Sequence, residues 1–226
     1  MSSKNTKKEL TAADKATLVE KAEQYTDGLV KKAHQAALQF EGYTQAQVDK
    51  IVAAMALAAS EHSLELAHEA HNETGRGIVE DKDTKNRFAS ESVYNSIKND
   101  KTVGVISENK VAGSVEIAAP LGVLAGIVPT TNPTSTTIFK SLLTAKTRNA
   151  IVFAFHPQAQ NCSSHAARIV YEAALKAGPQ KTLSNGSKIQ VFITLPHLSK
   201  TTVLLLSSLQ VDQGWSMQRS SQVILP

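Results

Sequence analysis

Two uninterrupted apolar runs constrain the fold more than any other feature of the sequence. LGVLAGIVP (residues 121–129) and AIVFAF (150–155) have the length of strands, and TSTTIFKSLLTAKTRN (134–149) between them reads as a helix. A further helical segment, QNCSSHAARIVYEAALKAG (160–178), follows the second run. Continuous apolar runs are typical of parallel strands that are buried on both faces. The order strand, helix, strand, helix predicts a βαβα unit with right-handed crossovers, and therefore an α/β fold.

The first hundred residues are predicted to be mostly helical. Apolar residues at steps of three and four predict a helix over residues 12–39. A second helix begins at Thr44, whose hydroxyl can form a capping box with Gln47, and its apolar stripe continues to Leu66. Glycines at 75 and 77 interrupt the pattern, and another helix extends to Ile97.

The period of the pattern then changes from that of a helix to that of a strand. KTVGVIS (101–107) and GSVEIAAP (113–120) are short β-like runs joined by the turn ENKVAG (108–113). This arrangement predicts a hairpin.

Composition excludes several classes of function. The net charge of +4 comes from 24 basic and 20 acidic residues that are scattered along the chain, which argues against nucleic-acid binding. The N-terminal residues 1–15 lack the apolar core of a secretion signal, and no apolar run approaches the length of a membrane span. A single cysteine, Cys162, cannot form an internal disulfide. We therefore expect a cytoplasmic protein without a membrane anchor.

Polar residues follow the first buried strand in the loop VPTTNPTS (128–135). Ligands of open α/β sheets bind beyond the carboxyl ends of the strands. Pro129 and Pro133 stiffen this loop, and Asn132 can direct an amide donor at a developing negative oxygen. An equally weighted alternative is that Asn132 hydrogen-bonds its own backbone as a cap. His156 and Pro157 follow the second buried strand, so both strand ends present polar groups to one side.

Three other clusters are interpreted as structural. Cys162 lies near a helix start with His165 three residues on, but a lone cysteine is usually a small buried hydrophobe. AHEAH (67–71) lacks the H-E-x-x-H spacing of zinc proteases and reads as a polar helix end, so we predict no metal site. EDKDTK (80–85) alternates acidic and basic residues and reads as a solvated turn.

PLGVLAGIVPTTNPTSTTIFKSLLTAKTRNAIVF (120–153), the HP at 156–157 and GIVEDKDTKNRFASE (77–91) closely resemble the aldehyde dehydrogenase half of the bacterial bifunctional aldehyde-alcohol dehydrogenases. The resemblance covers roughly residues 43–178. It implies the N-terminal part of an NAD-binding domain, with helices followed by a hairpin and a βαβα unit. The implied reaction is the NAD-dependent interconversion of an aldehyde and CoA, chiefly acetaldehyde, with the acyl-CoA.

The resemblance also implies roles for individual residues. Asn132 matches the asparagine that stabilises the oxyanion of the thiohemiacetal. The residues that match the strand ends along which the dinucleotide lies are Pro129, Thr130, Thr131, His156 and Pro157. The nucleophilic cysteine of the family belongs to a later domain and is not matched by Cys162. Small aldehydes and acyl-CoA are the implied partners, and homo-oligomers are the implied assembly.

Beyond Gly178 the resemblance stops abruptly, which we interpret as a change of reading frame. One permitted set of codons for residues 181–191 reads D-F-I-Q-W-I-E-D-P in a shifted frame, similar to the family's continuation. Residues 203–217 can likewise be encoded so that the same shifted frame gives a strand and a glycine-rich loop. We therefore predict that residues 1–178 belong to the NAD-binding domain and that 179–226 are an out-of-frame, poorly ordered tail.

This interpretation has three consequences. The chain would lack the catalytic cysteine and be inactive alone, or it would act as an interaction module that co-assembles with full-length enzyme. The incomplete sheet would expose strand edges, including residues 123–128 and 151–155. In the tail, QVFITL (190–195) and TTVLLLSSL (201–209) could still form short strands.

Overall fold

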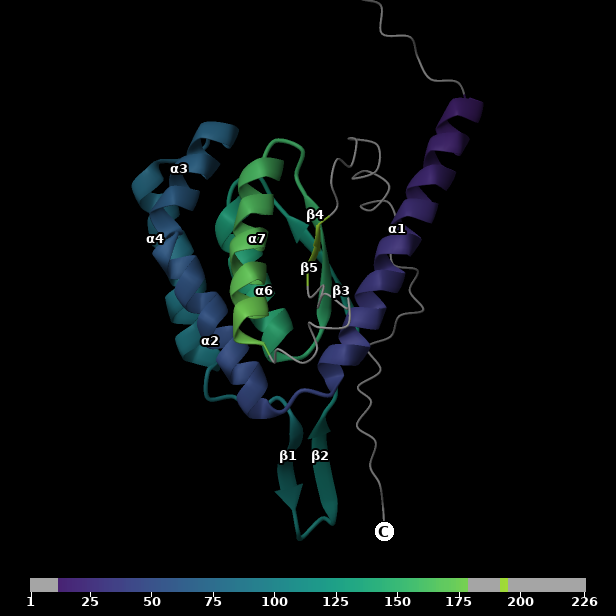
Figure 1. Cartoon of the computed structure of the whole chain (residues 1–226), viewed down its shortest axis with the longest axis vertical. Helices are drawn as coiled ribbons and strands as arrows, with labels where there is room; N and C mark the ends of the chain where they lie inside the picture. The colour runs from purple at the N-terminus through teal and green to yellow at the C-terminus, as the bar shows by residue number, and fades with distance from the viewer. Residues whose placement is uncertain (1–11, 179–191, 195–226) are drawn as a thin grey trace, which may run out of the picture.

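The computed structural model describes residues 12–178 and 192–194 and has the predicted α/β architecture (Figure 1). The helical elements are α1 (Ala12–Glu41), α2 (Gln45–Glu61), α3 (Ser63–Thr74), α4 (Val79–Arg87), a π-helical turn (Phe88–Ser92), α5 (Val93–Ile97), α6 (Pro133–Lys146) and α7 (Gln160–Ala177). The strands are β1 (Gly104–Asn109), β2 (Ser114–Ala118), β3 (Val123–Val128), β4 (Ala150–Phe155) and β5 (Phe192–Thr194).

The predicted capping box at the start of α2 is present. The backbone N–H of Gln47 donates to the Thr44 hydroxyl at 3.4 Å, and Gln47 Oε1 accepts from the Thr44 N–H at 2.9 Å. The stripe predicted to run on to Leu66 is divided between two helices, because the backbone at His62 departs from helical geometry. Gly75 ends α3 in the left-handed conformation, with φ of 64°, as its position in the pattern predicted.

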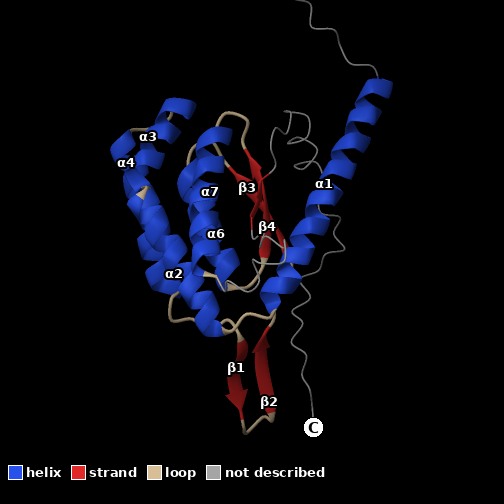
Figure 2. Ribbon diagram, in the orientation of Figure 1, coloured by secondary structure: helices blue, strands red, loops and turns tan. Residues whose placement is uncertain are grey.

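Three parallel strands form the sheet in the order β3–β4–β5. Helix α1 lies against one face of β3 and β4, while α6 and α7 cover the other face (Figure 1). Helices α2, α3 and α4 form an outer layer on α6 and α7 (Figure 2). The βαβα unit predicted from the two apolar runs is thus confirmed, with its helices packed on the sheet.

The hairpin predicted from the change of period is β1 paired antiparallel with β2. It projects from the body of the molecule as a separate ribbon (Figure 2). Every residue of β1 is exposed, so the hairpin contributes little to the core.

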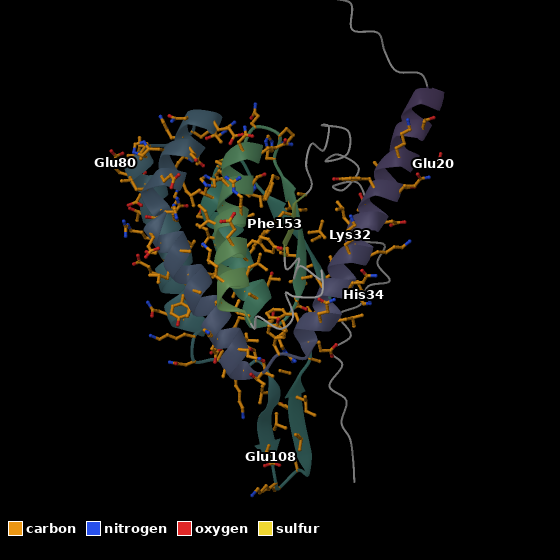
Figure 3. The ribbon with its side chains drawn as sticks, viewed as in Figure 1. Glu20, Lys32, His34, Glu80, Glu108 and Phe153 are labelled. Atoms are coloured by element: carbon orange, nitrogen blue, oxygen red, sulfur yellow. The ribbon has the colours of Figure 1, made fainter. Side chains whose placement is uncertain are left out.

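The largest core cluster lies between the sheet and the helices. Its members include Phe153 of β4, which is fully buried between the sheet and the helical layers (Figure 3). On the opposite face a small alanine-rich cluster joins α1 to the strands through Ala33, Ala37, Ala150 and Val152. Within residues 12–178 and 192–194, none of the helices combines the length and the apolar character that crossing a bilayer requires.

Two predictions about the strands were wrong. From its apolar run β3 was expected to be buried on both faces, but Ile127 is 59% exposed. The exposed edge predicted for residues 123–128 is present, since β3 has one strand neighbour within the described residues. β4 was expected to expose its edge, but it pairs with β3 on one side and β5 on the other.

Strand β5 falls within QVFITL, so a strand was correctly predicted there. Its residues Phe192–Thr194 pair in parallel with Ile151–Phe153 of β4. The second predicted strand of the tail, at 201–209, lies outside the described residues.

Candidate functional site

Strands β3 and β4 bring the two sequence motifs together at one end of the sheet. The backbone N–H of His156, just after β4, donates to the carbonyl of Val128, the last residue of β3, at 3.2 Å. The loop from Pro129 to Asn132 therefore begins beside the turn that contains His156 and Pro157. The sequence-predicted residues share one end of the sheet, as expected from parallel pairing.

Asn132 is the N-cap residue of α6, but its side chain makes no capping hydrogen bond. Its Nδ2 group donates to the Thr131 hydroxyl at 3.5 Å, a long contact. Its Oδ1 atom is buried and has no hydrogen-bond partner among the described residues. The alternative in which Asn132 caps its own helix is therefore not observed. The backbone carbonyl of Asn132 still starts the helix by accepting from the Thr136 N–H at 3.2 Å.

The start of α6 is fixed by a buried asparagine that the sequence analysis did not single out. Asn86, on α4, accepts from the Thr134 hydroxyl at 2.7 Å and donates to the Ser63 carbonyl of α3 at 2.9 Å. Both Asn86 and Thr134 are buried. This side chain links α3, α4 and α6, and its partner Thr134 lies two residues after Asn132. Its position within GIVEDKDTKNRF, part of the recognised resemblance, was the only sequence signal for it.

Lys82 is the second residue that sequence reasoning missed. EDKDTK was predicted to be a solvated turn, but it lies on helix α4 and its Lys82 side chain is only 5% exposed. The ammonium donates to the Thr131 carbonyl at 3.4 Å. Burial lowers the pKa of Lys82, and repulsion from Lys85 lowers it further. Glu80 also lies on α4, but it is exposed as predicted and points away from the body (Figure 3).

The remaining strand-end residues differ in their exposure. Pro129 and Thr131 are exposed, Thr130 is buried, and His156 and Pro157 are half-buried. The His156 Nδ1 atom accepts from the Gln158 backbone N–H at 3.2 Å, which orients the ring. Exposed and half-buried groups at the end of a parallel sheet can contact a ligand laid across it.

Cys162 is buried, as the structural interpretation predicted. The side chain is 1% exposed, and Sγ contacts the Ala159 carbonyl at 3.7 Å. Burial raises the pKa of the thiol to about 12, and the neighbouring Glu73 carboxylate contributes to the rise. A thiolate is the reactive form of cysteine, so this thiol is poorly suited to nucleophilic catalysis.

The N-terminal end of α7 is closed by Glu73 of α3. Its carboxylate oxygens accept from the backbone N–H groups of Asn161 at 2.9 Å and Cys162 at 2.7 Å. Partial burial raises the pKa of Glu73, but these hydrogen bonds outweigh that effect and hold it below its ordinary value. An anionic ligand would meet a carboxylate at this helix end, so phosphate binding there is disfavoured.

The histidines of AHEAH do not converge on one centre. His68 is exposed, and the His71 Nδ1 group donates to the Gly77 carbonyl at 2.9 Å. The Glu69 carboxylate instead accepts from His165 of α7 at 2.8 Å. The His68, Glu69 and His71 side chains of the motif therefore lie in three separate environments.

Comparisons with known proteins agree on one family. The model of the aldehyde dehydrogenase family matches residues 4–202, which extends past the boundary predicted at Gly178. The bifunctional aldehyde-alcohol dehydrogenase AdhE of Escherichia coli K12 is 52% identical over 157 residues, covering 70% of this chain and 18% of that protein. The aldehyde-alcohol dehydrogenase of Streptococcus pneumoniae TIGR4 is 50% identical over 199 residues, covering 88% of this chain and 22% of that protein. The chain thus spans about a fifth of the length of these relatives.

Solved structures show the same relationship. An acetylating aldehyde dehydrogenase from Geobacillus thermoglucosidasius superposes with a TM-score of 0.72 at 44% identity, over 80% of this chain and 38% of that one. A probable aldehyde dehydrogenase from Listeria monocytogenes gives a TM-score of 0.74 at 39% identity, over 81% and 39% of the two chains. Both are longer than the present chain, and both share its arrangement of helices and strands.

Proposed function

The chain belongs to the aldehyde dehydrogenase family, and on that premise we propose that it is the N-terminal part of the NAD-binding domain of an acylating member. The proposed reaction interconverts acetaldehyde, CoA and NAD with acetyl-CoA and NADH. The single observation that carries the proposal is that the Asn132 side chain makes no capping hydrogen bond to α6. This residue begins a helix without capping it, at the end of the sheet where ligands of α/β folds bind.

Asn132 is proposed to donate its side-chain amide to the oxyanion that forms when a thiolate attacks the carbonyl carbon. Preorganised donors at such a position stabilise the transition state more than the ground state. Two hydrogen bonds hold the loop in place: the Thr134 hydroxyl donates to Asn86, and the Thr131 carbonyl accepts from the Lys82 ammonium. Lys82 therefore supplies a positive charge close to the proposed oxyanion site, which also favours a negative intermediate.

NAD is proposed to lie along the ends of β3 and β4 and to accept the hydride from the substrate carbon. The residues proposed to contact it are Pro129, Thr130, Thr131, His156 and Pro157. The buried Oδ1 atom of Asn132 has no hydrogen-bond partner in the part of the chain that the structure describes. This fits the placement, because an acceptor buried without a partner is costly unless a ligand or water supplies a donor. Closure of the α7 N-terminus by Glu73 supports placing the dinucleotide phosphates elsewhere.

The attacking thiolate is proposed to come from a part of the enzyme outside these 226 residues. Cys162 is the only cysteine of the 226 residues, and its burial and raised pKa argue against it as the nucleophile. We propose that residues 179–226 are read out of frame and that the chain is inactive alone. The proposed cellular setting is the cytoplasm, and the proposed assembly is a homo-oligomer.

An activity assay tests this proposal. The 226-residue chain and the product of a gene whose frame is corrected near codon 178 are both assayed for acetyl-CoA-dependent oxidation of NADH. We expect turnover only from the frame-corrected protein, and N132A in that protein should lower kcat by about 10²–10³-fold. Activity of the 226-residue chain itself, or full activity of N132A, would overturn the proposed roles.

An interaction module is the second candidate function, and the exposed edge of β3 favours it. Leu121 is 82% exposed and Ile127 is 59% exposed, beside a strand edge that is unpaired within the described residues. Unpaired apolar edges are ready sites for pairing with another chain. Co-expression with a tagged full-length relative tests this function: stoichiometric co-purification that a Lys substitution at Ile127 abolishes supports it, and absence of co-purification refutes it.

A further inference from the structure

A cluster of carboxylates and an imidazole joins α3 to α7, outside the loop that carries Asn132. Glu65 and Glu69 lie on successive turns of α3, and His165 projects from the second turn of α7. One ligand atom from each lies within 4.8 Å of the other two. We call these three residues the α3–α7 cluster.

The two carboxylates of the cluster lie one helical turn apart and repel each other, and each accepts a hydrogen bond from a histidine. Glu69 accepts from His165 Nδ1 through both oxygens, at 2.8 Å and 2.9 Å. Glu65 accepts from His62 Nδ1 at 2.7 Å through Oε2. The hydrogen bond from His62 lowers the pKa of Glu65, and the charges of His62 and His165 contribute to the lowering. A carboxylate only accepts, so both imidazoles carry their hydrogen on Nδ1.

We propose that the α3–α7 cluster binds a divalent first-row transition-metal cation of the Zn²⁺ type. Glu65, Glu69 and His165 would provide two carboxylate oxygens and one imidazole nitrogen, ligand types that zinc accepts, and water would complete a tetrahedron. The two carboxylates neutralise the charge of the cation. His62 holds the Glu65 carboxylate from outside, in the way that second-layer partners orient metal ligands.

Binding of the cation displaces the hydrogen on His165 Nδ1, which is donated to Glu69 in the metal-free chain. In a neutral ring this proton moves from Nδ1 to Nε2, and in an imidazolium it is released to the solvent, so the ligating nitrogen keeps its lone pair for the cation. Ligand atoms around a tetrahedral zinc lie about 3.3–3.6 Å apart, given bond lengths of about 2.0–2.2 Å. We expect rotation of the Glu65 and Glu69 side chains, which are exposed and half-buried respectively, to bring the ligand atoms to that spacing.

The cluster is accessible to a hydrated cation. Side-chain exposure is 51% for Glu65, 38% for Glu69 and 22% for His165. Clefts open on both sides of His165, one lined also by Asn72 and Glu73, the other by His62 and Arg168. A bound cation would connect the outer helical layer to α7, so it should stabilise the packing of these two helices.

Zinc titration of the complete 226-residue chain tests the site. Chelator-treated protein is titrated with ZnCl₂ by calorimetry, and Co²⁺ is added in a parallel experiment to record its visible absorption. We expect one equivalent of Zn²⁺, a tetrahedral Co²⁺ spectrum and a higher Tm in the presence of zinc. H165Q and E69Q should abolish all three, and H62Q should weaken binding by about tenfold.

H68Q is the matched control, because His68 is an exposed histidine on the same helix and lies outside the cluster. It should bind zinc as the unmodified chain does. E65Q is a second test variant. Because the Glu65 side chain is exposed, its replacement should not unfold the protein, and circular dichroism checks that each variant is folded. Unchanged zinc binding by folded E65Q and H165Q, or no binding by the unmodified chain, would overturn the proposal and leave the cluster as a network of hydrogen bonds.

Discussion

The Glu73 carboxylate of α3 accepts a hydrogen bond from the backbone N–H of Cys162 at 2.7 Å, at the start of α7. Its other oxygen accepts from Asn161 at 2.9 Å. One acidic side chain therefore caps a helix that lies far from it in sequence. The same contact places a negative charge beside the only thiol, so Glu73 stabilises the fold and suppresses the reactivity of Cys162.

Removing this carboxylate should destabilise the protein. E73A leaves two N–H groups of α7 without their charged acceptor, and we expect a loss of about 1–3 kcal/mol in the free energy of unfolding. Urea denaturation followed by circular dichroism measures it. E23A on the exposed surface of α1 is the control and should change stability by less than about 0.5 kcal/mol.

The contribution of Glu73 should also depend on pH. Its pKa in the folded state is lowered from an ordinary value of 4.5, so its stabilisation is complete above that value and is lost as the pH falls through the lower, folded pKa. The stability difference between the unmodified chain and E73A should therefore shrink as the pH falls below about 4.5. A difference that stays constant down to pH 3 would show that the carboxylate charge plays no part.

Cys162 should be unreactive in the folded protein. Burial raises the pKa of its thiol to about 12, so almost no thiolate is present at pH 8. We expect labelling by a disulfide reagent such as DTNB to be slow in buffer and rapid in denaturant. Rapid stoichiometric labelling without denaturant would contradict both the burial and the structural role assigned to this residue.

Gly126 of β3 should tolerate no side chain. A Cβ at this position would lie 2.7 Å from Ile151 Cδ1 and 2.7 Å from Phe153 Cδ1, both in the packed interior. We expect G126A to cost about 1–3 kcal/mol. G28A on α1 is the matched control: its Cβ meets nothing within 4 Å among the described residues, and alanine should stabilise that helix by up to about 1 kcal/mol. Equal stabilities for the two variants would contradict the packing of β3 on β4.

N132A should leave the stability of the chain nearly unchanged. Replacing a capping asparagine by alanine usually costs about 1 kcal/mol, but the side chain of Asn132 makes no capping hydrogen bond. We expect a change of less than about 0.5 kcal/mol in thermal or urea unfolding. S141A is a useful comparison, because the buried Ser141 hydroxyl donates to the Thr137 carbonyl at 2.7 Å. A loss of 1 kcal/mol or more in N132A would show that the residue is structural.

Local patterns in the sequence predicted the elements that depend on neighbouring residues. The capping box at Thr44 and the strands built on apolar runs follow from side chains a few positions apart. The burial of Lys82, in contrast, depends on its reaching the Thr131 carbonyl, 49 residues away. Likewise, the apolar run at 121–129 predicted burial on both faces, whereas the exposure of Ile127 depends on which elements pack against β3.

The same distinction between local patterns and distant contacts applies to the candidate site. The proximity of Asn132 and His156 could be predicted because each lies just beyond the end of a strand, and parallel strands end together. Asn86 and Glu73 could not, since their partners Thr134 and Cys162 lie 48 and 89 residues away. Such contacts are set by the packing of whole helices, which no short motif encodes.

Reading the coding DNA across codons 170–226 in all three frames tests most directly whether residues 1–178 belong to a longer acylating aldehyde dehydrogenase. We expect one shifted frame to give D-F-I-Q-W-I-E-D-P, then a glycine-rich loop, and further on the cysteine that attacks the substrate. Stop codons in both other frames soon after codon 178 would contradict this, and residues 179–226 would then be the true continuation of the protein.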